Sequence, residues 1–237
     1  MISQALKDRF YRGERYDGTK LFYDWIRQHT GPETVLLNLG AGPATGQVVR
    51  NLKGRVAKVV GADIDPDVLG NAELDEAHVL TSDLLPFPDQ SFDVVLSDYV
   101  LEHVEHPRGF LSEVNRVLRP GGRFFFRTPN RSHYVALISR ATPHWFHELV
   151  ANRVRGRGDH DHAPYPTFYR MNSVARLRRT AEACGFSSSD LRLVEMEPSY
   201  LMISRVLFLG GVAYERLVNH FDALAPLRAN IFGCLVK

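Results

Sequence analysis

Apolar residues in the first half of the chain gather in short continuous runs that polar segments separate. The runs cover residues 34–39, 57–63, 78–81, 92–97 and 122–128. Continuous apolar runs of this length predict strands that are buried on both faces, as in a parallel sheet. Because helical patterns lie between the runs, the alternation predicts an α/β fold with right-handed crossovers.

The helical patterns begin and end at recognisable residues. Helices are predicted over 3–12 and 18–30, ahead of the first strand, and over 107–119. Pro107 suits the first turn of the last of these helices, and Pro120 with Gly121 stops it. The face of this helix that is expected to be buried consists of Phe110, Leu111, Val114, Val117 and Leu118.

The second half continues the pattern after one long interruption. Residues 131–170 follow the fifth strand without strand or long helical periodicity, except for a short helix expected over 134–140. A segment this long, placed at the carboxyl edge of the sheet, predicts a substrate-recognition insert. The elements expected after it are a helix over 171–184, a strand over 191–197, an apolar helical segment over 200–222 and a last strand over 229–236.

The first strand ends abruptly in a glycine turn, Gly40-Ala41-Gly42, after which the chain is expected to resume as a helix. Glycine lets a ligand approach the backbone where a Cβ would collide, and a helix N-terminus directs free N–H groups at it. The turn therefore predicts a nucleotide-like cofactor. Thr45 stands where the dinucleotide fingerprint has its third glycine, which argues against a nicotinamide dehydrogenase.

Two acids follow later strands. Asp63 ends the second apolar run and can accept hydrogen bonds from a ribose diol. Asp83 follows the third strand and can accept from an adenine amine. The chain then carries a fourth strand ending near Ser97, and a Pro-Gly-Gly turn at 120–122 leads into the fifth.

In this order and spacing, these motifs resemble the class I S-adenosylmethionine-dependent methyltransferases over roughly residues 33–130. Segments 99–104, 118–122 and 127–131 resemble the branch that includes ubiquinone-biosynthesis O-methyltransferases. One departure is Asn38, where the family often has an acid: its amide oxygen can still accept from the methionine ammonium, without the charge. Ala44 replaces a common third glycine of that family, and its small size is tolerable.

The resemblance implies a Rossmann-like class I methyltransferase fold. Its sheet would have seven strands, mostly parallel with an antiparallel last strand, a helical substrate insert after strand 5 and a helical insertion at 200–222 before the last strand. The chain is expected to be a single domain over 1–237. Its expected parts are N-terminal helices (1–32), a cofactor-binding core (33–130), the insert (131–170) and the C-terminal half of the sheet (171–237).

The resemblance also implies the cofactor contacts. Gly40 and Gly42 would pass under the methionine end, Asp63 would hold the ribose, and Asp83 would meet the adenine. The expected cofactor-binding residues are Tyr16, Asn38, Gly40, Ala41, Gly42, Asp63, Ile64, Ser82, Asp83, Leu84 and Ser97. Tyr16 has two interpretations, a lid over the cofactor or core packing of the N-terminal helices.

Methyl transfer is an in-line displacement, so alignment of the nucleophile supplies much of the rate. An oxygen or nitrogen nucleophile also benefits from a general base, and the candidates are His103, His133, His160 and His162. The first two histidines can instead orient loops by packing, and the last two can belong to a solvated loop. Residues 159–162 carry metal-ligand residue types, but such runs are mostly solvated, and no metal is expected.

Substrate contacts are expected from Tyr134, Arg155, Tyr165 and Tyr169. Arg155 suits a carboxylate or phosphate, although a solvated charged loop explains the same residues. The apolar segment 200–222 is either buried, part of a subunit interface, or at a membrane surface.

Composition limits the classes of partner. The net charge of +2 on 237 residues does not predict nucleic-acid binding, and the apolar segment near residue 205 is interrupted by Arg205, so no spanning helix is expected. Two cysteines and a charged N-terminus predict a cytoplasmic protein with reduced thiols. The expected activity is methyl transfer to an oxygen of a small, lipophilic or aromatic metabolite. The alternatives are a nitrogen acceptor and a non-catalytic cofactor-binding interaction protein.

Overall fold

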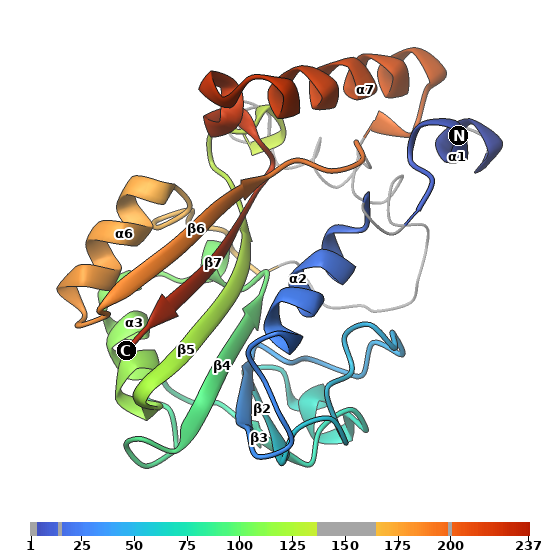
Figure 1. The fold of residues 1–237 in the computed structure, drawn as a ribbon. Helices are drawn as coiled ribbons and strands as arrows, with labels where there is room; N and C mark the ends of the chain where they lie inside the picture. Colours follow the sequence, from blue (N-terminus) through green and yellow to red (C-terminus); the bar gives the residue numbers. More distant parts are fainter. Residues whose placement is uncertain (1–3, 14–15, 137–164, 199–200) are drawn as a thin grey trace. The chain divides into compact units, whose positions relative to one another are not determined.

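The computed structural model describes residues 4–13, 16–136, 165–198 and 201–237, drawn as ribbon in Figure 1. The chain divides into two compact units. We call the first the helical unit; its ranges are Met1–Gly18, Pro129–Pro166 and Leu193–Asn230. The second, the sheet unit, consists of Thr19–Thr128, Thr167–Arg192 and Ile231–Lys237.

The strands of the described residues form one seven-stranded sheet in the order β3-β2-β1-β4-β5-β7-β6. The pairs β3-β2, β2-β1, β1-β4 and β4-β5 are parallel. Their carboxyl ends therefore meet at one edge of the sheet. The strands are β1 (Val35–Leu39), β2 (Lys58–Asp63), β3 (Glu76–Val79), β4 (Phe92–Asp98), β5 (Leu118–Pro129), β6 (Ser188–Val194) and β7 (Asn230–Val236).

The last strand runs against its neighbour β5, as the arrows of Figure 1 show. The amide of Gly121 donates to the carbonyl of Lys237 at 3.1 Å, and the amide of Asn130 donates to the carbonyl of Ala229 at 2.7 Å. Because one residue number rises while its partner's falls, the pairing is antiparallel. The predicted α/β sheet with an antiparallel last strand is confirmed.

Helices cover both faces of β5 because its apolar side chains alternate. The ring of Phe124 lies 6.1 Å from that of Phe110 on α3 (Pro107–Val117), whereas the ring of Phe125 lies 5.3 Å from that of Trp25 on α2 (Gly18–Arg27). Helix α3 also packs against α6 (Val174–Ala183). These three helices confirm the predictions over 107–119, 18–30 and 171–184.

The helix predicted after the glycine turn is wrong. Residues 41–57 contain turns and bends but neither helix nor strand. Gly46 has a φ of +67°, whereas an α-helix requires a φ near −63°. The carboxylate of Glu73 accepts from the amides of Thr45 and Gly46, at 3.3 and 2.8 Å, so the loop N–H groups bind a side chain of this chain.

The connections around β2 and β4 are also short. After β2 the chain forms a single 3₁₀ element, η2 (Pro66–Gly70), and after β4 it forms η3 (Leu101–His103). Because these elements are short, the residues that follow β2 and β4 stay close to the carboxyl edge of the sheet.

The helical unit is built on α7 (Arg205–His220), with α1 (Gln4–Phe10) and η5 (Asp222–Leu227). Its core contains the buried side chains of Tyr11, Phe208 and Val212. The predicted helical segment before the last strand is confirmed by α7. The insert after β5 begins with helical residues 134–136, and residues 137–164 lie outside the described residues.

Candidate active site

The glycine turn lies directly beyond β1, at the carboxyl edge of the sheet. The amide of Gly40 donates to the carbonyl of Ala62 at 2.7 Å, which ties the turn to the end of β2. The φ of Gly40 is +83°, and a Cβ added there would collide with a methyl group of Val100. Only glycine satisfies both constraints, so the turn brings bare backbone to the edge of the sheet.

Asp63 ends β2 and binds the same turn. Its Oδ2 accepts from the amide of Gly42 at 2.7 Å, and its Oδ1 accepts from the amide of Asp65 at 2.9 Å. Each carboxylate oxygen has a further lone pair, and the side chain is partly exposed. Ile64, the next residue, is 60% exposed and presents an apolar surface beside this carboxylate.

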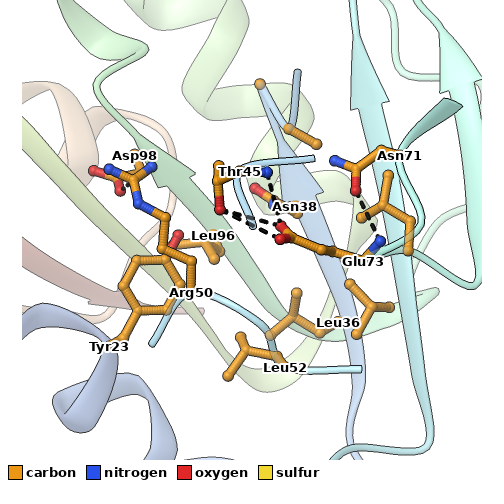
Figure 2. Close-up of a pocket in the computed structure, with 14 residues that line it drawn as sticks. Tyr23, Leu36, Asn38, Thr45, Arg50, Leu52, Asn71, Glu73, Leu96 and Asp98 are labelled. Atoms are coloured by element: carbon orange, nitrogen blue, oxygen red, sulfur yellow. Dashed lines mark hydrogen bonds and ion pairs between the residues drawn. The ribbon is translucent and has the colours of Figure 1, made fainter. Parts of the chain in front are cut away.

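A cavity opens beside β1 and β4 (Figure 2). Three of the predicted cofactor residues, Asn38, Gly40 and Ala41, line it. The other lining residues include polar side chains that the sequence analysis missed: Tyr23, Thr45, Arg50, Asn71, Glu73 and Asp98. The other predicted cofactor residues are not among those that line it: Tyr16, Gly42, Asp63, Ile64, Ser82, Asp83, Leu84 and Ser97.

Asp98, at the end of β4, lines this cavity and pairs with two arginines. It accepts two hydrogen bonds of 2.7 Å from Arg127, and Nη1 of Arg50 lies 3.3 Å from its Oδ2. Burial alone would lower the pKa of Arg127, but the hydrogen bonds that Arg127 donates to Asp98 outweigh burial, and its pKa is raised. Burial also raises the pKa of Tyr23, with the charge of Asp98 adding to the effect.

The cluster holds two arginines and one acid, and Glu73, which lines the same cavity, balances its charge. Arg127 is held rigidly, because its guanidinium lies 4.6 Å from the ring centre of Tyr99 and donates to Thr19 at 3.0 Å. Arg50 has the more exposed side chain of the two, and its guanidinium lies beside Asp98 in Figure 2. The signal that could have found the cluster is Arg127 itself, a charge within the apolar run of β5.

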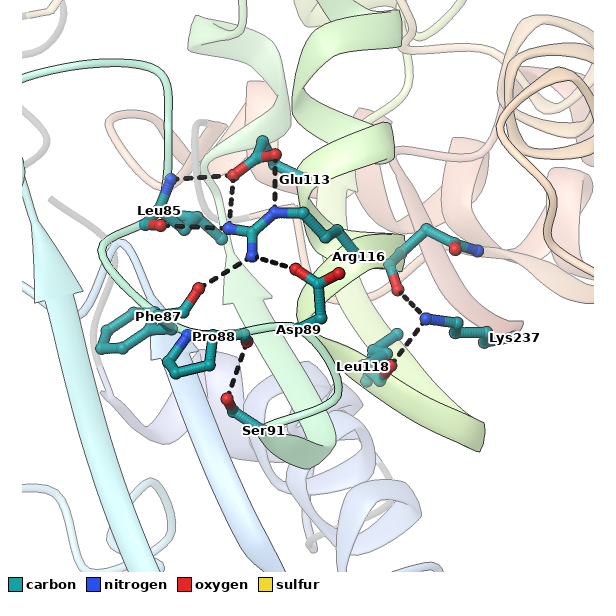
Figure 3. Close-up of polar contacts among 10 residues, drawn as sticks. Leu85, Phe87, Pro88, Asp89, Ser91, Glu113, Arg116, Leu118 and Lys237 are labelled. Atoms are coloured by element: carbon teal, nitrogen blue, oxygen red, sulfur yellow. Dashed lines mark hydrogen bonds and ion pairs between the residues drawn. The ribbon is translucent and has the colours of Figure 1, made fainter.

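The loop between β3 and β4 carries the predicted adenine contacts. Asp83 is exposed and Leu84 is 70% exposed, while the hydroxyl of Ser82 donates to the carbonyl of Leu84 at 3.3 Å. Figure 3 shows how α3 holds this loop: Arg116 donates to the carbonyls of Leu85 and Phe87 at 3.1 and 2.8 Å.

Glu113 completes that anchor. It accepts from the amide of Leu85 at 3.0 Å and from Nη2 of Arg116 at 2.8 Å. Hydrogen bonding to Arg116 holds the pKa of Glu113 below its usual range. The side of the loop that faces α3 is thus fixed, while Asp83 and Leu84 are exposed to solvent.

Ser97 has a structural contact inside the sheet. Its side chain is 0% exposed, and its hydroxyl donates to the carbonyl of Leu39 at 2.9 Å. Ser97 therefore joins β4 to β1, and its contact with the cofactor stays a prediction.

His103 ends η3, just beyond β4, and is partly exposed. The preceding residue, Glu102, is 5% exposed and accepts from the hydroxyl of Thr128 at 3.1 Å. Burial raises the pKa of Glu102, and the charge of His103 partly offsets this. The sequence analysis missed Glu102, although an acid within the apolar segment 99–104 is a usable signal.

Other predicted residues belong to the helical unit. His133 is 6% exposed, and its Nε2 lies 3.4 Å from Oε2 of Glu195. The ring of Tyr134 lies 4.1 Å from that of His133. Tyr16 packs against Tyr11 at 5.2 Å, which favours the packing interpretation of that residue.

The remaining predicted substrate and base residues fall in or near the insert. Tyr165 is 43% exposed, and Tyr169, with a φ of +51°, donates its amide to the carbonyl of Glu102 at 3.2 Å. Arg155, His160 and His162 lie outside the described residues.

Comparisons with known proteins identify the family. A family profile described as "Methyltransferase domain" matches residues 37–126. The chain is 40% identical over 171 residues to a demethylmenaquinone methyltransferase of Tropheryma whipplei, covering 65% of this chain and 67% of that protein. The chain belongs to the S-adenosylmethionine-dependent methyltransferases.

Other comparisons agree with this assignment. The methyltransferase is 30% identical over 188 residues to a ubiquinone biosynthesis O-methyltransferase of Aeromonas salmonicida, which covers 74% of this chain and 73% of that protein. Its fold is similar to that of an S-adenosylmethionine-dependent methyltransferase from Archaeoglobus fulgidus, with a TM-score of 0.57, 17% identity and 98% coverage of both chains.

The residues of the methyltransferase fit its cofactor, S-adenosylmethionine. At Gly40 there is room for bare backbone only, and Asp63 offers lone pairs for hydroxyl groups. Ile64 and Leu84 expose apolar surface of the kind that an adenine ring covers. Within the described ranges, there is no group of three or more His, Cys, Asp or Glu side chains that could hold a metal ion. In the same ranges there is no helix long and apolar enough to cross a membrane.

Proposed function

We propose that this methyltransferase transfers a methyl group to an oxygen atom of a small lipophilic or aromatic metabolite. The curated relatives support a ring-bearing acceptor, because their names refer to ubiquinone biosynthesis and to demethylmenaquinone. His103, beside the buried carboxyl group of Glu102 at the carboxyl end of β4, supplies a base for the proton of the acceptor, and the name of the O-methyltransferase relative favours oxygen as the acceptor atom.

In this proposal the predicted residues hold the cofactor as follows. The backbone of Gly40, Ala41 and Gly42 passes under the methionine end, where Asn38 accepts from its ammonium group. The carboxylate of Asp63 accepts from the ribose hydroxyls, since both of its oxygens keep a free lone pair. The adenine contacts come from Ile64, Ser82, Asp83 and Leu84.

Arg50 is a further residue that we assign to this site. It lines the cavity with Asn38 and Gly40, and Asp98, its partner at 3.3 Å, is already neutralised by Arg127. In this proposal the guanidinium of Arg50 pairs with the carboxylate of the methionine end.

When bound, S-adenosylmethionine supplies a methyl group activated by the sulfonium charge. The residues of the chain must align the acceptor and remove its proton. His103 accepts the proton of the acceptor hydroxyl, and the nearby carboxyl group of Glu102 stabilises the imidazolium that forms. The other predicted substrate and base residues stay proposals for binding and deprotonating the acceptor. They are the aromatic residues Tyr134, Tyr165 and Tyr169, the cation Arg155, and the alternative bases His133, His160 and His162.

The test is an assay with S-adenosylmethionine and a matched set of aromatic acceptors: a catechol, the corresponding ring without hydroxyl groups, and the corresponding aniline. Formation of S-adenosylhomocysteine reports turnover, and the NMR spectrum of the product identifies the methylated atom, because methylation at oxygen, nitrogen or carbon adds the same mass. An O-methylated product from the catechol, with no turnover of the other two compounds, supports the proposal. An N-methylated product from the aniline alone would favour the nitrogen acceptor, and a C-methylated product from the catechol or from the ring without hydroxyl groups would show transfer to carbon.

The role of His103 is tested separately with His103→Gln. We expect kcat to fall about 100-fold or more, with the Kd for S-adenosylhomocysteine unchanged. His106→Gln is the matched control, because His106 is exposed three residues further on and makes no side-chain cap to α3. Equal kcat values for the two variants would exclude His103 as the base.

A further inference from the structure

Tyr99, the residue that follows β4, combines a left-handed backbone with an exposed aromatic side chain. Its φ is +60°, a conformation that non-glycine residues adopt rarely and at a cost in energy. Its amide donates to the carbonyl of Arg127 at 2.8 Å, which ties this conformation to β5. Tyr99 is 38% exposed, whereas every other residue of the described stretch 92–104 is more buried. Residues held in such conformations cluster at active sites and ligand clamps.

The ring of Tyr99 is supported by a fixed guanidinium. Arg127 lies 4.6 Å from the ring centre, in a cation–π contact, and is itself only 3% exposed. Two hydrogen bonds of 2.7 Å to Asp98 and one of 3.0 Å to Thr19 hold the guanidinium in place. The exposed part of the ring is therefore a preformed flat surface, and a ligand that binds it has little side-chain freedom left to remove.

The strand order places Tyr99 beside the methionine end of the proposed cofactor site. A Cβ added at Gly40 would meet a methyl group of Val100, so the residue next to Tyr99 contacts the glycine turn. In the sheet β1 lies between β2 and β4, so Tyr99 and the ribose acid Asp63 lie on opposite sides of that turn. The methyl group leaves from the methionine end, and an acceptor in line with it is therefore expected on the β4 side.

We propose that Tyr99 is an acceptor-binding residue whose ring packs against an aromatic ring of the methyl acceptor. Two aromatic rings in contact attract each other beyond the effect of burial alone, because their quadrupoles favour offset and edge-to-face arrangements. A saturated ring of the same size lacks this attraction. The role of Tyr99 rests on the proposed function and makes a flat aromatic ring, next to the methylated atom, the feature that the site selects.

The adenine ring of the cofactor fits Tyr99 less well. The proposed adenine residues Ile64 and Leu84 follow β2 and β3, and β1 separates both of these strands from β4. Neighbouring strands lie about 4.8 Å apart, so the end of β4 is roughly 10 Å from the end of β2. The ring of Tyr99 therefore has the acceptor as its partner.

The experiment measures the binding of two matched diols to the full chain saturated with S-adenosylhomocysteine. The probes are 2,3-dihydroxynaphthalene and decalin-2,3-diol, which carry the same hydroxyl groups on an aromatic and on a saturated ring system. We expect wild type to bind the aromatic diol about fivefold more tightly than the saturated one. Tyr99→Leu should raise the Kd of the aromatic diol about fivefold and leave the Kd of the saturated diol within about twofold.

Three further variants separate ring contact with the acceptor from packing within the chain. Tyr99→Phe keeps the ring and should bind both diols as wild type does. Tyr99→Gly adopts the left-handed φ without strain, so it should fold and lose the aromatic preference as Tyr99→Leu does. Phe221→Leu is the matched control, because Phe221 is a 50% exposed aromatic residue that follows α7 and has no role in the proposed site.

Kinetics with a methylated aromatic acceptor give a second measurement. Tyr99→Leu should raise the KM of the acceptor about fivefold and leave kcat within about twofold, because the ring binds the ground state and the transition state alike. The Kd for S-adenosylhomocysteine should equal that of wild type. A role in packing alone would instead change the Tm and leave the KM of the acceptor as it is.

Three outcomes would overturn the role of Tyr99: equal affinity of wild type for the two diols, an aromatic preference that survives in Tyr99→Leu and Tyr99→Gly, or an equal rise in the Kd for S-adenosylhomocysteine, which would assign the ring to the cofactor. The proposed function has its own readout in the methylated atom. Methylation at nitrogen would contradict the oxygen acceptor and leave the role of Tyr99 in place. O-methylation without a preference for the aromatic diol would contradict the role of Tyr99 alone.

Discussion

At the residue scale, Gly40 shows how one position joins two strands to a ligand site. Its backbone combines a φ of +83° with contact to Val100. Gly40→Ala should therefore cost about 2–5 kcal/mol of unfolding free energy, from backbone strain and overpacking together. Gly46→Ala is the control: its φ of +67° gives a similar strain, but a Cβ there meets open space, so we expect about 1–2 kcal/mol. Equal losses in urea unfolding would contradict the packing argument.

Replacing Glu102 by Gln should raise the stability of the protein but lower its kcat. Because burial raises the pKa of Glu102, the protonated side chain favours the folded state. This contribution to stability is complete below the unfolded pKa of about 4.5 and is lost as the pH rises through the raised pKa of the folded state. Glu102→Gln cannot ionise, so its Tm should equal that of wild type below about pH 4.5 and exceed it by an amount that grows as the pH rises towards the raised folded pKa of Glu102.

The kinetic effect of the same substitution should be a lower kcat, since the carboxyl group no longer stabilises His103. Glu105→Gln serves as the control, because that side chain is 49% exposed in a surface pair with Arg170. A Tm difference that does not change with pH would contradict the assignment of burial as the cause.

At the element scale, the anchor between α3 and the β3–β4 loop is the contact that fixes the proposed adenine residues. Arg116→Ala removes hydrogen bonds to two backbone carbonyls and to Glu113, with Arg116 only 30% exposed. We expect a loss of about 1–3 kcal/mol in urea unfolding. Lys58→Ala, in a pair with Glu76 where both side chains are more than 40% exposed, should cost less than about 1 kcal/mol.

The pH dependence of that anchor follows from Glu113. Since Arg116 depresses the pKa of Glu113, the stability it provides is present above about pH 4.5 and is lost as the pH falls through the lower folded value. The difference between wild type and Arg116→Ala should therefore narrow below pH 4.5. A constant difference would show that the ion pair adds nothing to the neutral hydrogen bonds.

The elements differ in how far their sequences determine them. The parallel strands and α3 could be predicted because their apolar spacing has a single interpretation. The loop 41–57 could not, because its local sequence tolerates a helix and the deciding contact comes from Glu73, about 27 residues away. Long-range acceptors of this kind leave no periodic signal.

At the whole-molecule scale, the order of motifs predicted the family and the sheet, whereas individual side-chain roles depended on packing. Ser97 and Asp98 are adjacent in sequence, yet one is sealed inside the sheet and the other lines the cavity. Strand alternation explains the difference only once the register of β4 against β1 is known. The acceptor-side residues depend on the insert, whose sequence has no periodicity from which to predict contacts.

The most direct test of the account is calorimetric titration of S-adenosylhomocysteine into the folded protein, freed of co-purified ligand, for wild type, Asp63→Ala and Asp67→Ala. Asp67 is an exposed carboxylate four residues beyond Asp63 and controls for general loss of charge. We predict that wild type binds S-adenosylhomocysteine with a micromolar Kd and that the Kd of Asp67→Ala lies within twofold of it. The Kd of Asp63→Ala should be at least tenfold higher, which corresponds to a loss of about 1.4 kcal/mol in binding free energy. Asp63→Asn, which keeps an acceptor for the Gly42 amide, distinguishes loss of the ligand contact from loss of the turn. Absence of binding by wild type, or equal affinity in wild type and Asp63→Ala, would contradict the assigned site.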